Sequence, residues 1–307
     1  MGRRDLRDVS PARVFGKPTL SEVWLGPQQR RARAFGVAAE GQHSAALLLG
    51  PRSCGKSIVL DQVLAAVAPD HFFRLSDDWD SGAALLGALL ESAGLGGAGL
   101  SEIDQRNLLQ TFLDLQHRQG NRVVFAVDDA EKLSPDAWGE LLRISAMRTG
   151  DLVPSMLFAG RPSAAARIKG RQPAMWRLVG ANVHNMPAPG SADCSTYIEH
   201  RLYAAGVDTA VFPLRARLLI GRLAQGSFTR VNLLAQTAMM LGRQGGRDAI
   251  SEAMVFDASR RIASGVAARQ ARGTRARSPS RQGQIDPIER FDDGVPTLHE
   301  VRLPGSH

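Results

Sequence analysis

The fold is decided by one stretch of the sequence, Gly50-Pro51-Arg52-Ser53-Cys54-Gly55-Lys56-Ser57. It satisfies the pattern G-x-x-x-x-G-K-[ST]. An apolar run at 45–49 precedes it, and apolar residues at helical spacing follow over 58–67. The glycines let the backbone turn tightly, so that its N–H groups and the N-terminus of the following helix face a negatively charged ligand. The stretch and its flanks therefore predict a strand, a phosphate-binding loop and a helix.

Each residue of this motif has an expected task. Lys56 reaches the terminal phosphates of a nucleotide, and Ser57 holds Mg²⁺ through its hydroxyl oxygen. Cys54 is either a thiol that the helix N-terminus makes sensitive to oxidation or a small residue tolerated at a variable loop position. ATP and Mg²⁺ are the predicted cofactors. The remaining phosphate-binding positions are Gly50, Pro51, Arg52, Ser53, Cys54 and Gly55.

A pair of carboxylates follows the most apolar β-branched segment. Residues 122–127, RVVFAV, have the pattern of a buried parallel strand, and Asp128-Asp129 comes directly after them. A carboxylate at the end of such a strand binds Mg²⁺ directly or through water, which makes Asp128 a predicted metal ligand. Asp129 is the candidate general base for the attacking water. The alternative is an Asp-Asp pair that only ends the strand and begins a turn.

Strand and helix patterns alternate as far as Pro189. A serine and a proline, Ser134-Pro135, open one helix as its N-cap and first residue. Alternation of this kind predicts a parallel sheet covered on both faces, an α/β fold with three layers, αβα. The expected strands lie at 45–49, 71–75, 122–127, 156–160 and 182–186. Helical patterns lie between them at 58–67, 83–93, 103–117 and 164–168.

The chain divides into four predicted regions. Residues 1–37 are polar and punctuated by proline and glycine, and form an arm that leads into a helix. Residues 38–189 form the nucleotide-binding core with its five-stranded sheet. Helical patterns without strands follow over 190–264, which predicts a small all-helical lid. Residues 265–307 lack a core-forming pattern and are expected to be a disordered, arginine-bearing tail.

The charge of the chain is unevenly distributed. Its formal net charge is +8, and residues 260–281 contain seven arginines and no acidic residue. The core is therefore only mildly basic, and the arginine segment is a candidate contact for nucleic acid. The two cysteines, Cys54 and Cys194, are too few for a disulfide framework. The apolar runs are too short to span a bilayer and no secretory signal opens the chain, so a cytoplasmic protein without a transmembrane segment is expected.

Several stretches together resemble AAA+ ATPases of the ExeA/GspA general-secretion type. The resemblance covers about residues 20–262, and the transposition ATPases of the TnsC and TniB type share the same core. It implies a P-loop AAA+ domain followed by a helical lid, with the nucleotide between the two. The stretches that carry it are 50–57, 122–133 (RVVFAVDDAEKL), 156–162 (MLFAGRP), 197–202 (YIEHRL) and 226–232 (GSFTRVN).

The resemblance implies two further nucleotide contacts. Arg230 matches the arginine of a lid helix that touches the terminal phosphate and reports nucleotide state; the alternative is an exposed helix arginine. Arg161 stands where the family has a polar sensor residue, usually glutamine. Arginine is a departure at this position, and it either contacts phosphate or forms an ion pair with a neighbour.

Two departures from the family bear on hydrolysis. Asp128-Asp129-Ala130-Glu131 replaces Asp-Glu-Ala-Gln, so the expected catalytic carboxylate is one methylene shorter, which predicts slow turnover. Either Glu131 compensates, or the protein is an ATP switch that hardly hydrolyses. The arginine that would face a neighbouring subunit does not align, and Arg171 and Arg177 are the nearest candidates.

Two functions follow as hypotheses. The first is a Mg²⁺-dependent ATPase, a homo-oligomer in which lid motion assembles or remodels a protein partner of a secretion or mobile-element system. The second is an ATP-dependent DNA-binding regulator of the transposition type, in which the arginines of 260–281 contact DNA phosphates. A weakly hydrolysing switch is the third possibility.

Overall fold

The computed structural model describes residues 9–42, 45–76, 79–147 and 154–273 of the 307-residue chain. Its contacts divide into two compact units. The sheet unit consists of the described residues within 32–49 and 59–185. The helical unit consists of the described residues up to 31, the loop segment 50–58 and the described residues from 186 onward.

The described part of the chain contains one parallel sheet of five strands in the order β2-β3-β4-β1-β5. The predicted strand positions and the α/β fold class are thereby confirmed. Leu49 pairs with Gly160, and Val127 pairs with both Leu75 and Phe158, so the carboxyl ends of the strands meet at one edge. The strands are β1 (Ala45–Leu49), β2 (His71–Leu75), β3 (Val123–Val127), β4 (Ser155–Gly160) and β5 (Val183–Asn185).

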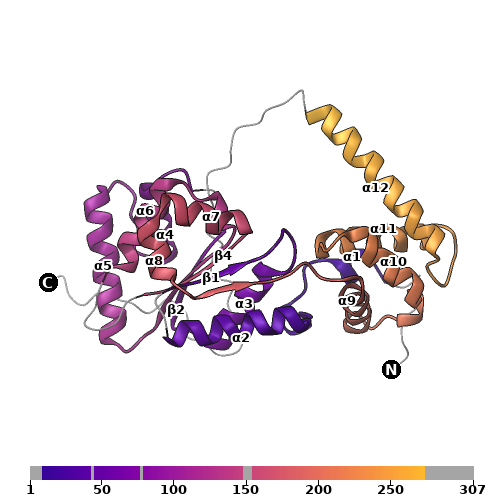
Figure 1. Cartoon of the computed structure of the whole chain (residues 1–307), viewed down its shortest axis with the longest axis horizontal. Coiled ribbons are helices and arrows are strands. Elements are labelled where there is room, and N and C mark those ends of the chain that lie inside the picture. Colours follow the sequence, from indigo (N-terminus) through magenta and orange to yellow (C-terminus); the bar gives the residue numbers. More distant parts are fainter. Residues whose placement is uncertain (1–8, 43–44, 77–78, 148–153, 274–307) are drawn as a thin grey trace. The chain divides into compact units, whose positions relative to one another are not determined.

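Helices cover both faces of this sheet (Figure 1). Alternate strand residues such as Leu47 and Phe125 pack with α4, α5 and α6 in the main core, whereas Ala46 and Leu48 face α2 and α3. The expected three layers are therefore present. The helices are α2 (Pro27–Gln42), α3 (Lys56–Val67), α4 (Gly82–Ser92), α5 (Glu102–Arg118), α6 (Pro135–Ser145), α7 (Pro162–Arg171) and α8 (Pro173–Val179).

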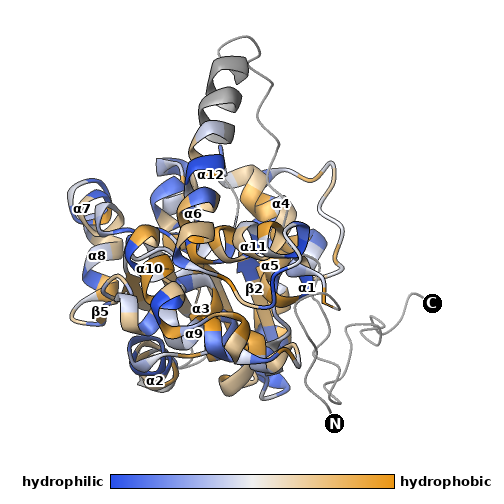
Figure 2. Cartoon of the chain, turned by 90° about the vertical axis from the view of Figure 1, so that its right-hand side faces the viewer, coloured by the Kyte–Doolittle hydropathy of each residue, from blue (hydrophilic) through white to orange (hydrophobic). Residues whose placement is uncertain are grey.

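Local sequence explains where these helices begin and which of them lie in the core. Ser134 caps α6 by accepting a hydrogen bond from the Ala137 N–H at 3.1 Å, with Pro135 as the first helical residue, as predicted. Helix α4 is orange along most of its length in Figure 2, and its four leucines are fully buried. Only apolar side chains fit such a position, because it has little contact with water.

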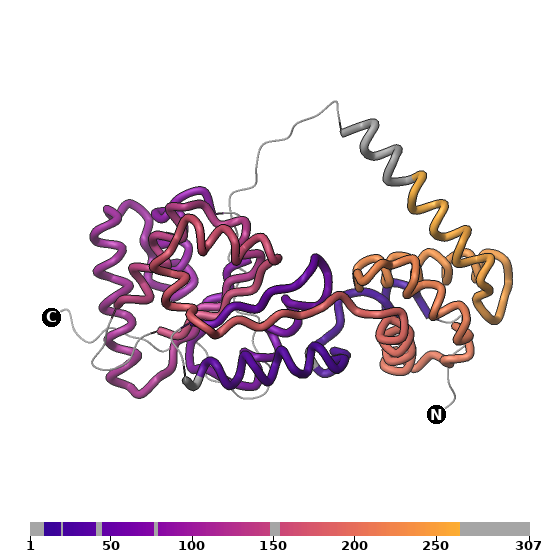
Figure 3. Tube along the Cα trace, in the orientation of Figure 1, coloured from indigo at the N-terminus to yellow at the C-terminus, as the bar shows by residue number. Residues whose placement is uncertain are grey.

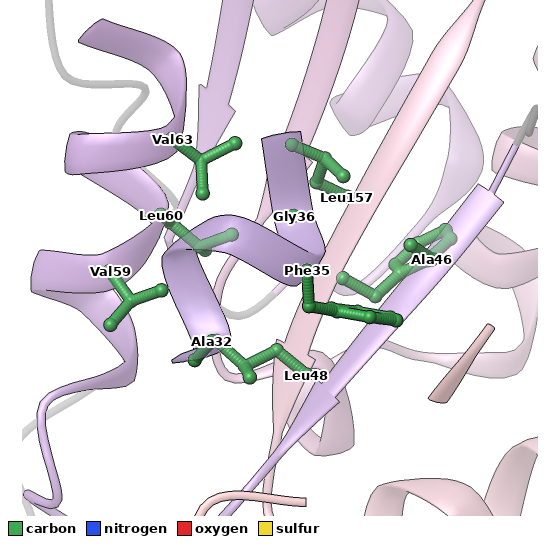
Figure 4. Close-up of a pocket in the computed structure, with 10 residues that line it drawn as sticks. Ala32, Phe35, Gly36, Ala46, Leu48, Val59, Leu60, Val63 and Leu157 are labelled. Atoms are coloured by element: carbon green, nitrogen blue, oxygen red, sulfur yellow. The ribbon is translucent and has the colours of Figure 1, made fainter. Parts of the chain in front are cut away.

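A small apolar cavity of about 10 Å³ lies between α2, α3 and the sheet (Figure 4). Phe35 and Gly36 of α2 face Leu60 and Val63 of α3 across it. At Gly36 an added Cβ would lie 2.6 Å from a Val63 methyl carbon. The two helices therefore approach closely at this glycine, and the cavity holds at most one water.

The helical unit has a hydrophobic core of its own, formed by side chains such as Ile198, Phe212 and Ile220. Helix α12 runs to Gly273, beyond the predicted start of the tail, because alanine, arginine and glutamine in 262–273 favour helix. Residues 274–307, which include Arg275, Arg277 and Arg281, lie outside the described residues. The helices are α1 (Pro11–Phe15), α9 (Ser191–Ala204), α10 (Leu214–Ala224), α11 (Phe228–Gln244) and α12 (Glu252–Gly273), with 3-10 turns η1 (Leu20–Glu22) and η3 (Thr209–Val211).

The N-terminal segment is part of the helical unit. Val9, Val14 and Phe15 are buried in its core, and Figure 3 traces the indigo segment among the orange helices. Side chains of α9 and α11 donate to its carbonyl oxygens, from Arg201 to Gly16 at 2.8 Å and from Gln236 to Phe15 at 3.0 Å. The polar composition of this segment did not predict that it packs into a core.

None of the described helices combines the length and the apolar composition that crossing a bilayer requires.

Candidate nucleotide-binding site

The loop of the motif begins directly after β1 and ends at the start of α3. Ser53 and Gly55 have φ angles of 58° and 103°, the left-handed region that turns the chain sharply. An added Cβ at Gly50 would lie 2.8 Å from Cys54 Sγ, so this position tolerates only glycine without rearrangement. The Cys54 thiol itself is fully buried. The predicted strand, loop and helix are thus present, with left-handed residues at Ser53 and Gly55 and a close approach at Gly50.

The Lys56 side chain folds back over the loop. Its ammonium group donates to the carbonyl oxygens of Gly50 at 3.0 Å and Pro51 at 2.9 Å, and the residue is 6% exposed. A buried ammonium requires such partners, because leaving it unpaired away from water is costly. The positive charge is therefore held inside the turn of the loop.

Two residues from other parts of the helical unit hold the loop backbone. Gln29 of α2 donates its side-chain amide to the Cys54 carbonyl oxygen at 3.0 Å. The Phe228 N–H, at the start of α11, donates to the Ser53 carbonyl oxygen at 3.0 Å. The Phe228 ring packs against Trp24 and Tyr197. The motif did not predict these two contacts, because they come from residues far away in the sequence.

Arg230 lies in the first turn of α11, where Ser227 is the N-cap. Its guanidinium donates to the Gln225 side-chain oxygen at 2.7 Å, and the residue is exposed. The arginine is thus accessible to solvent and is held by a neutral partner only five positions away. That contact therefore contains no carboxylate.

Asp128 follows β3 and is 8% exposed. Its Oδ1 accepts the Asp129 N–H at 2.9 Å, and its Oδ2 accepts a hydrogen bond from Arg74 of β2 at 3.0 Å. Arg74 also pairs with Asp61 of α3 at 3.1 Å. The signal for Arg74 is visible in the sequence as the single charge in the otherwise mostly apolar strand HFFRL, but its partners are not.

Asp129 adopts a left-handed conformation with φ 46°. It precedes the 3-10 turn η2 (Ala130–Lys132), and its carboxylate pairs with the Lys132 ammonium at 2.9 Å. The side chain is 41% exposed, so water has access to the carboxylate. The candidate base therefore lies beside a cation, just after the strand that precedes Asp128.

Glu131 and Arg161 form an ion pair. Arg161 Nε lies 2.8 Å from Glu131 Oε1, and the Arg161 N–H donates to Oε2 at 3.0 Å. Arg167 donates to the Glu131 carbonyl oxygen. Of the two roles open to Arg161, the structure contains the ion pair with a neighbour. Arg171 and Arg177, the candidates for a subunit-facing arginine, are exposed on α7 and α8.

The oxygen donors suit Mg²⁺. A serine hydroxyl at Ser57 and a carboxylate at Asp128 are the hard ligands that this ion prefers, and Mg²⁺ is usually completed by waters and substrate phosphates. Among the described residues no group of three or more His, Cys, Asp and Glu side chains could hold a metal ion.

Comparison with known proteins agrees with this architecture. Residues 39–168 match the family model described as an AAA domain. No curated protein matches the sequence. Cdc6p from Pyrobaculum aerophilum is similar in structure, with a TM-score of 0.69 and 16% identity over 82% of this chain and 71% of that one. The Aeropyrum pernix ORC1 protein in complex with DNA has a TM-score of 0.64, 18% identity and coverage of 82% and 69%.

A third similar structure is the RuvB Holliday junction branch migration motor of Thermotoga maritima, with a TM-score of 0.53, 13% identity and coverage of 80% and 72%. At sequence identities of 13–18%, structural similarity shows a shared fold. The match over 39–168 lies on the segment that contains the loop, Asp128 and Arg161. The chain therefore has the α/β AAA+ fold with a C-terminal helical region.

Proposed function

We propose that this chain binds ATP with Mg²⁺ and hydrolyses it. The backbone N–H groups of the loop 50–55 bind the phosphates, except at Pro51, which has no N–H. Lys56 neutralises the terminal phosphates, and Ser57 and Asp128 hold the metal. The observation that supports this best is the loop itself, with left-handed Ser53 and Gly55 between β1 and α3 and with the Lys56 ammonium held inside it. The AAA domain match over 39–168 supports the same function.

Hydrolysis in this proposal is slow. When bound, Mg²⁺ stabilises the charge of the transferred phosphoryl group. Asp129 orients the attacking water and takes its proton. Its short side chain and its pairing with Lys132 both reduce its effectiveness as a base. Glu131 does not replace it, because the Glu131 carboxylate is occupied by Arg161.

In this proposal the helical unit is the part that moves when the nucleotide binds or is hydrolysed. Its helix α11 carries Arg230 in the first turn and donates the Phe228 N–H to the loop carbonyl of Ser53. A phosphate that repositions the loop would therefore act on α11 directly. We propose that this motion assembles or remodels a protein partner in a homo-oligomer, as in ExeA-type ATPases, and that the protein works in the cytoplasm.

A second candidate is ATP-dependent binding to DNA. The supporting observation is the concentration of arginines that begins at Arg260 and Arg261, both exposed on α12. The similar ORC1 structure from Aeropyrum pernix is a complex with DNA. In this candidate the arginines of 260–281 supply sequence-independent phosphate contacts, which makes binding steeply dependent on salt.

One set of measurements tests both candidates. Nucleotide binding is followed with a fluorescent ATP analogue and turnover as phosphate release, each with and without duplex DNA over a salt series. Lys56→Ala should abolish both, whereas the matched control Lys169→Ala, an exposed lysine of α7, should change neither. Equal binding by wild type and Lys56→Ala would disprove the nucleotide site.

A truncation before Gly265 separates the DNA candidate from the ATPase. Loss of DNA retention with unchanged turnover would support a DNA contact by the arginine segment. If turnover ignores DNA and the truncation leaves DNA retention unchanged, the DNA candidate is lost and the ATPase stands alone.

A further inference from the structure

Three charged side chains of the sheet unit form a linked cluster. Arg74 of β2 reaches Asp61 of α3 through Nε at 3.1 Å and Asp128 through Nη2 at 3.0 Å. The side chains of Arg74 and Asp128 are only 13% and 9% exposed, whereas that of Asp61 is 43% exposed. We call these three residues the Arg74 cluster.

The stability of the sheet does not explain this arginine. Arg74 pairs in register with Ala126 of β3, at a position where an apolar residue would fit without desolvating a guanidinium. Its Nη1 is buried and makes no hydrogen bond with any described residue. Burying this guanidinium costs desolvation free energy that the sheet does not need, which points to a role for Arg74 in the chemistry of Asp128.

The charges around Asp128 can be counted. Two carboxylates and one guanidinium leave the Arg74 cluster with one net negative charge. The next carboxylate, Asp129, is already balanced by Lys132 at 2.9 Å. Of these five described side chains, the three of the Arg74 cluster therefore carry the net negative charge.

Asp61 connects the cluster to the helix that carries the other predicted metal ligand. Ser57 and Asp61 are four positions apart on α3 and so lie on one face of it. Arg74 thus links Asp128, which follows β3, to Asp61 of α3. Asp61 also forms an ion pair with Arg74. The positive charge of Arg74 is therefore shared between two carboxylates and offsets the charge of Asp128 only in part.

We propose that Arg74 positions Asp128 and balances its charge, and thereby raises the Mg²⁺ concentration that nucleotide binding requires. Asp61 has the opposite effect and lowers that concentration. This inference rests on the proposed function. A guanidinium 3.0 Å from a metal-binding carboxylate repels a second cation there and lowers the affinity of the site for Mg²⁺. Removing Arg74 removes that repulsion, whereas removing the charge of Asp61 strengthens it.

The proposal predicts opposite effects for two neighbouring substitutions. Arg74→Gln makes the cluster more negative and should lower the Mg²⁺ concentration for half-maximal nucleotide binding about fivefold to tenfold. Asp61→Asn makes it neutral and should raise that concentration about threefold to fivefold. The double variant restores the original net charge and should return near the wild-type value. Arg74→Lys keeps the charge and should also stay near it.

The experiment titrates the full chain with MgCl₂ in the presence of a fluorescent ATP analogue, with EDTA as the zero point. Thermal unfolding without nucleotide is measured for every variant, to identify those that lose their fold. Arg122→Gln, at the opposite end of β3, is the matched control and should leave the Mg²⁺ requirement unchanged. If Arg74→Gln does not fold, Asp61→Asn and Arg74→Lys still test the proposal, because the Asp61 side chain is partly exposed.

The outcomes separate this inference from the function on which it rests. Opposite shifts for Arg74→Gln and Asp61→Asn, with recovery in the double variant, support it. Shifts in the same direction, or none, while the wild type binds nucleotide, would overturn it and leave the proposed function intact. If the wild type fails to bind nucleotide with Mg²⁺, the proposed function falls and the inference with it.

Discussion

Asp129 combines three properties at one residue. It has a left-handed backbone, an exposed carboxylate and an ion pair with Lys132. Aspartate and asparagine tolerate the left-handed region better than most residues, because their short polar side chains bond locally. The position therefore allows a charge to be removed without disturbing the turn, which makes the proposed base testable in isolation.

Asp129→Asn should lower ATP turnover about a hundredfold, because the amide cannot accept the proton of the attacking water. Nucleotide binding should stay near the wild-type value, since the loop and Lys56 are untouched. Phosphate release and binding of a fluorescent ATP analogue measure the two effects. Unchanged turnover would remove Asp129 from the role of base.

His71, at the start of β2, shows how burial acts on a single titratable group. Its pKa lies below the ordinary value because burial disfavours the charged ring, and a hydrogen bond with Gln116 offsets this only in part. The folded state therefore binds a proton less readily than the unfolded state. The neutral ring therefore contributes to stability at pH values above the ordinary histidine pKa. This contribution is lost as the pH falls through that value towards the lower pKa of the folded state.

The Tm of the wild type should consequently fall between pH 7.5 and pH 5.5, and His71→Gln should reduce that fall. Glutamine keeps a polar side chain beside Gln116 but does not titrate. Thermal unfolding followed by circular dichroism at the two pH values measures the difference. An equal fall in both proteins would show that other groups control acid stability.

At the scale of elements, α2 and α3 pack against one face of the sheet around a single glycine. An added Cβ at Gly36 would lie 2.6 Å from a Val63 methyl carbon and 3.3 Å from the other. Valine is stiff at χ1, so its methyl groups cannot swing away at little cost. The contact is thus a size constraint between two helices, with the small cavity of Figure 4 beside it.

Gly36→Ala should destabilise the protein by about 1–3 kcal/mol, despite the better helix propensity of alanine, because the added methyl group overpacks the contact. Val63→Ala alone should also destabilise it by leaving a cavity. The double variant should be more stable than the sum of the two effects predicts, by about 1 kcal/mol. Urea unfolding of the four proteins measures this coupling; simple additivity would mean that the helices shift apart freely.

At the scale of the whole molecule, segments from opposite parts of the chain build one unit. The core of the helical unit includes Val14 and Phe15 of the N-terminal segment. The Phe15 ring packs edge-on against the Phe212 ring, with 6.0 Å between the ring centroids. The same unit contains the loop 50–58. We therefore expect that a change in the packing of the N-terminal segment also affects the conformation of the loop, because both belong to this unit.

Phe15→Ala should destabilise the helical unit by about 3–5 kcal/mol, the usual cost of deleting a buried aromatic ring. Limited proteolysis should then cleave within 190–264 sooner than in the wild type. Lys17→Ala, a change in the same segment outside the core, should leave the cleavage rate unchanged. Equal protection of the Phe15 variant would mean that the N-terminal segment is dispensable for the unit.

The sequence by itself determined the strands, the tight loop between β1 and α3, and the position of Asp128. These features depend on neighbouring residues: a motif of fixed spacing, short apolar runs, and a serine and proline that begin α6. Local patterns of this kind survive in the folded state because they agree with the packing around them.

The tertiary structure alone decided the partners of the charged side chains and the place of the N-terminal segment. Arg74 meets Asp128 across 54 positions, Arg161 meets Glu131 across 30, and Arg201 meets the Gly16 carbonyl oxygen across 185. Ionic and hydrogen-bonding groups can pair with many partners of suitable chemistry. Only the packing of the sheet and of the helical core brings one of those partners within reach, and no local pattern in the sequence records which one.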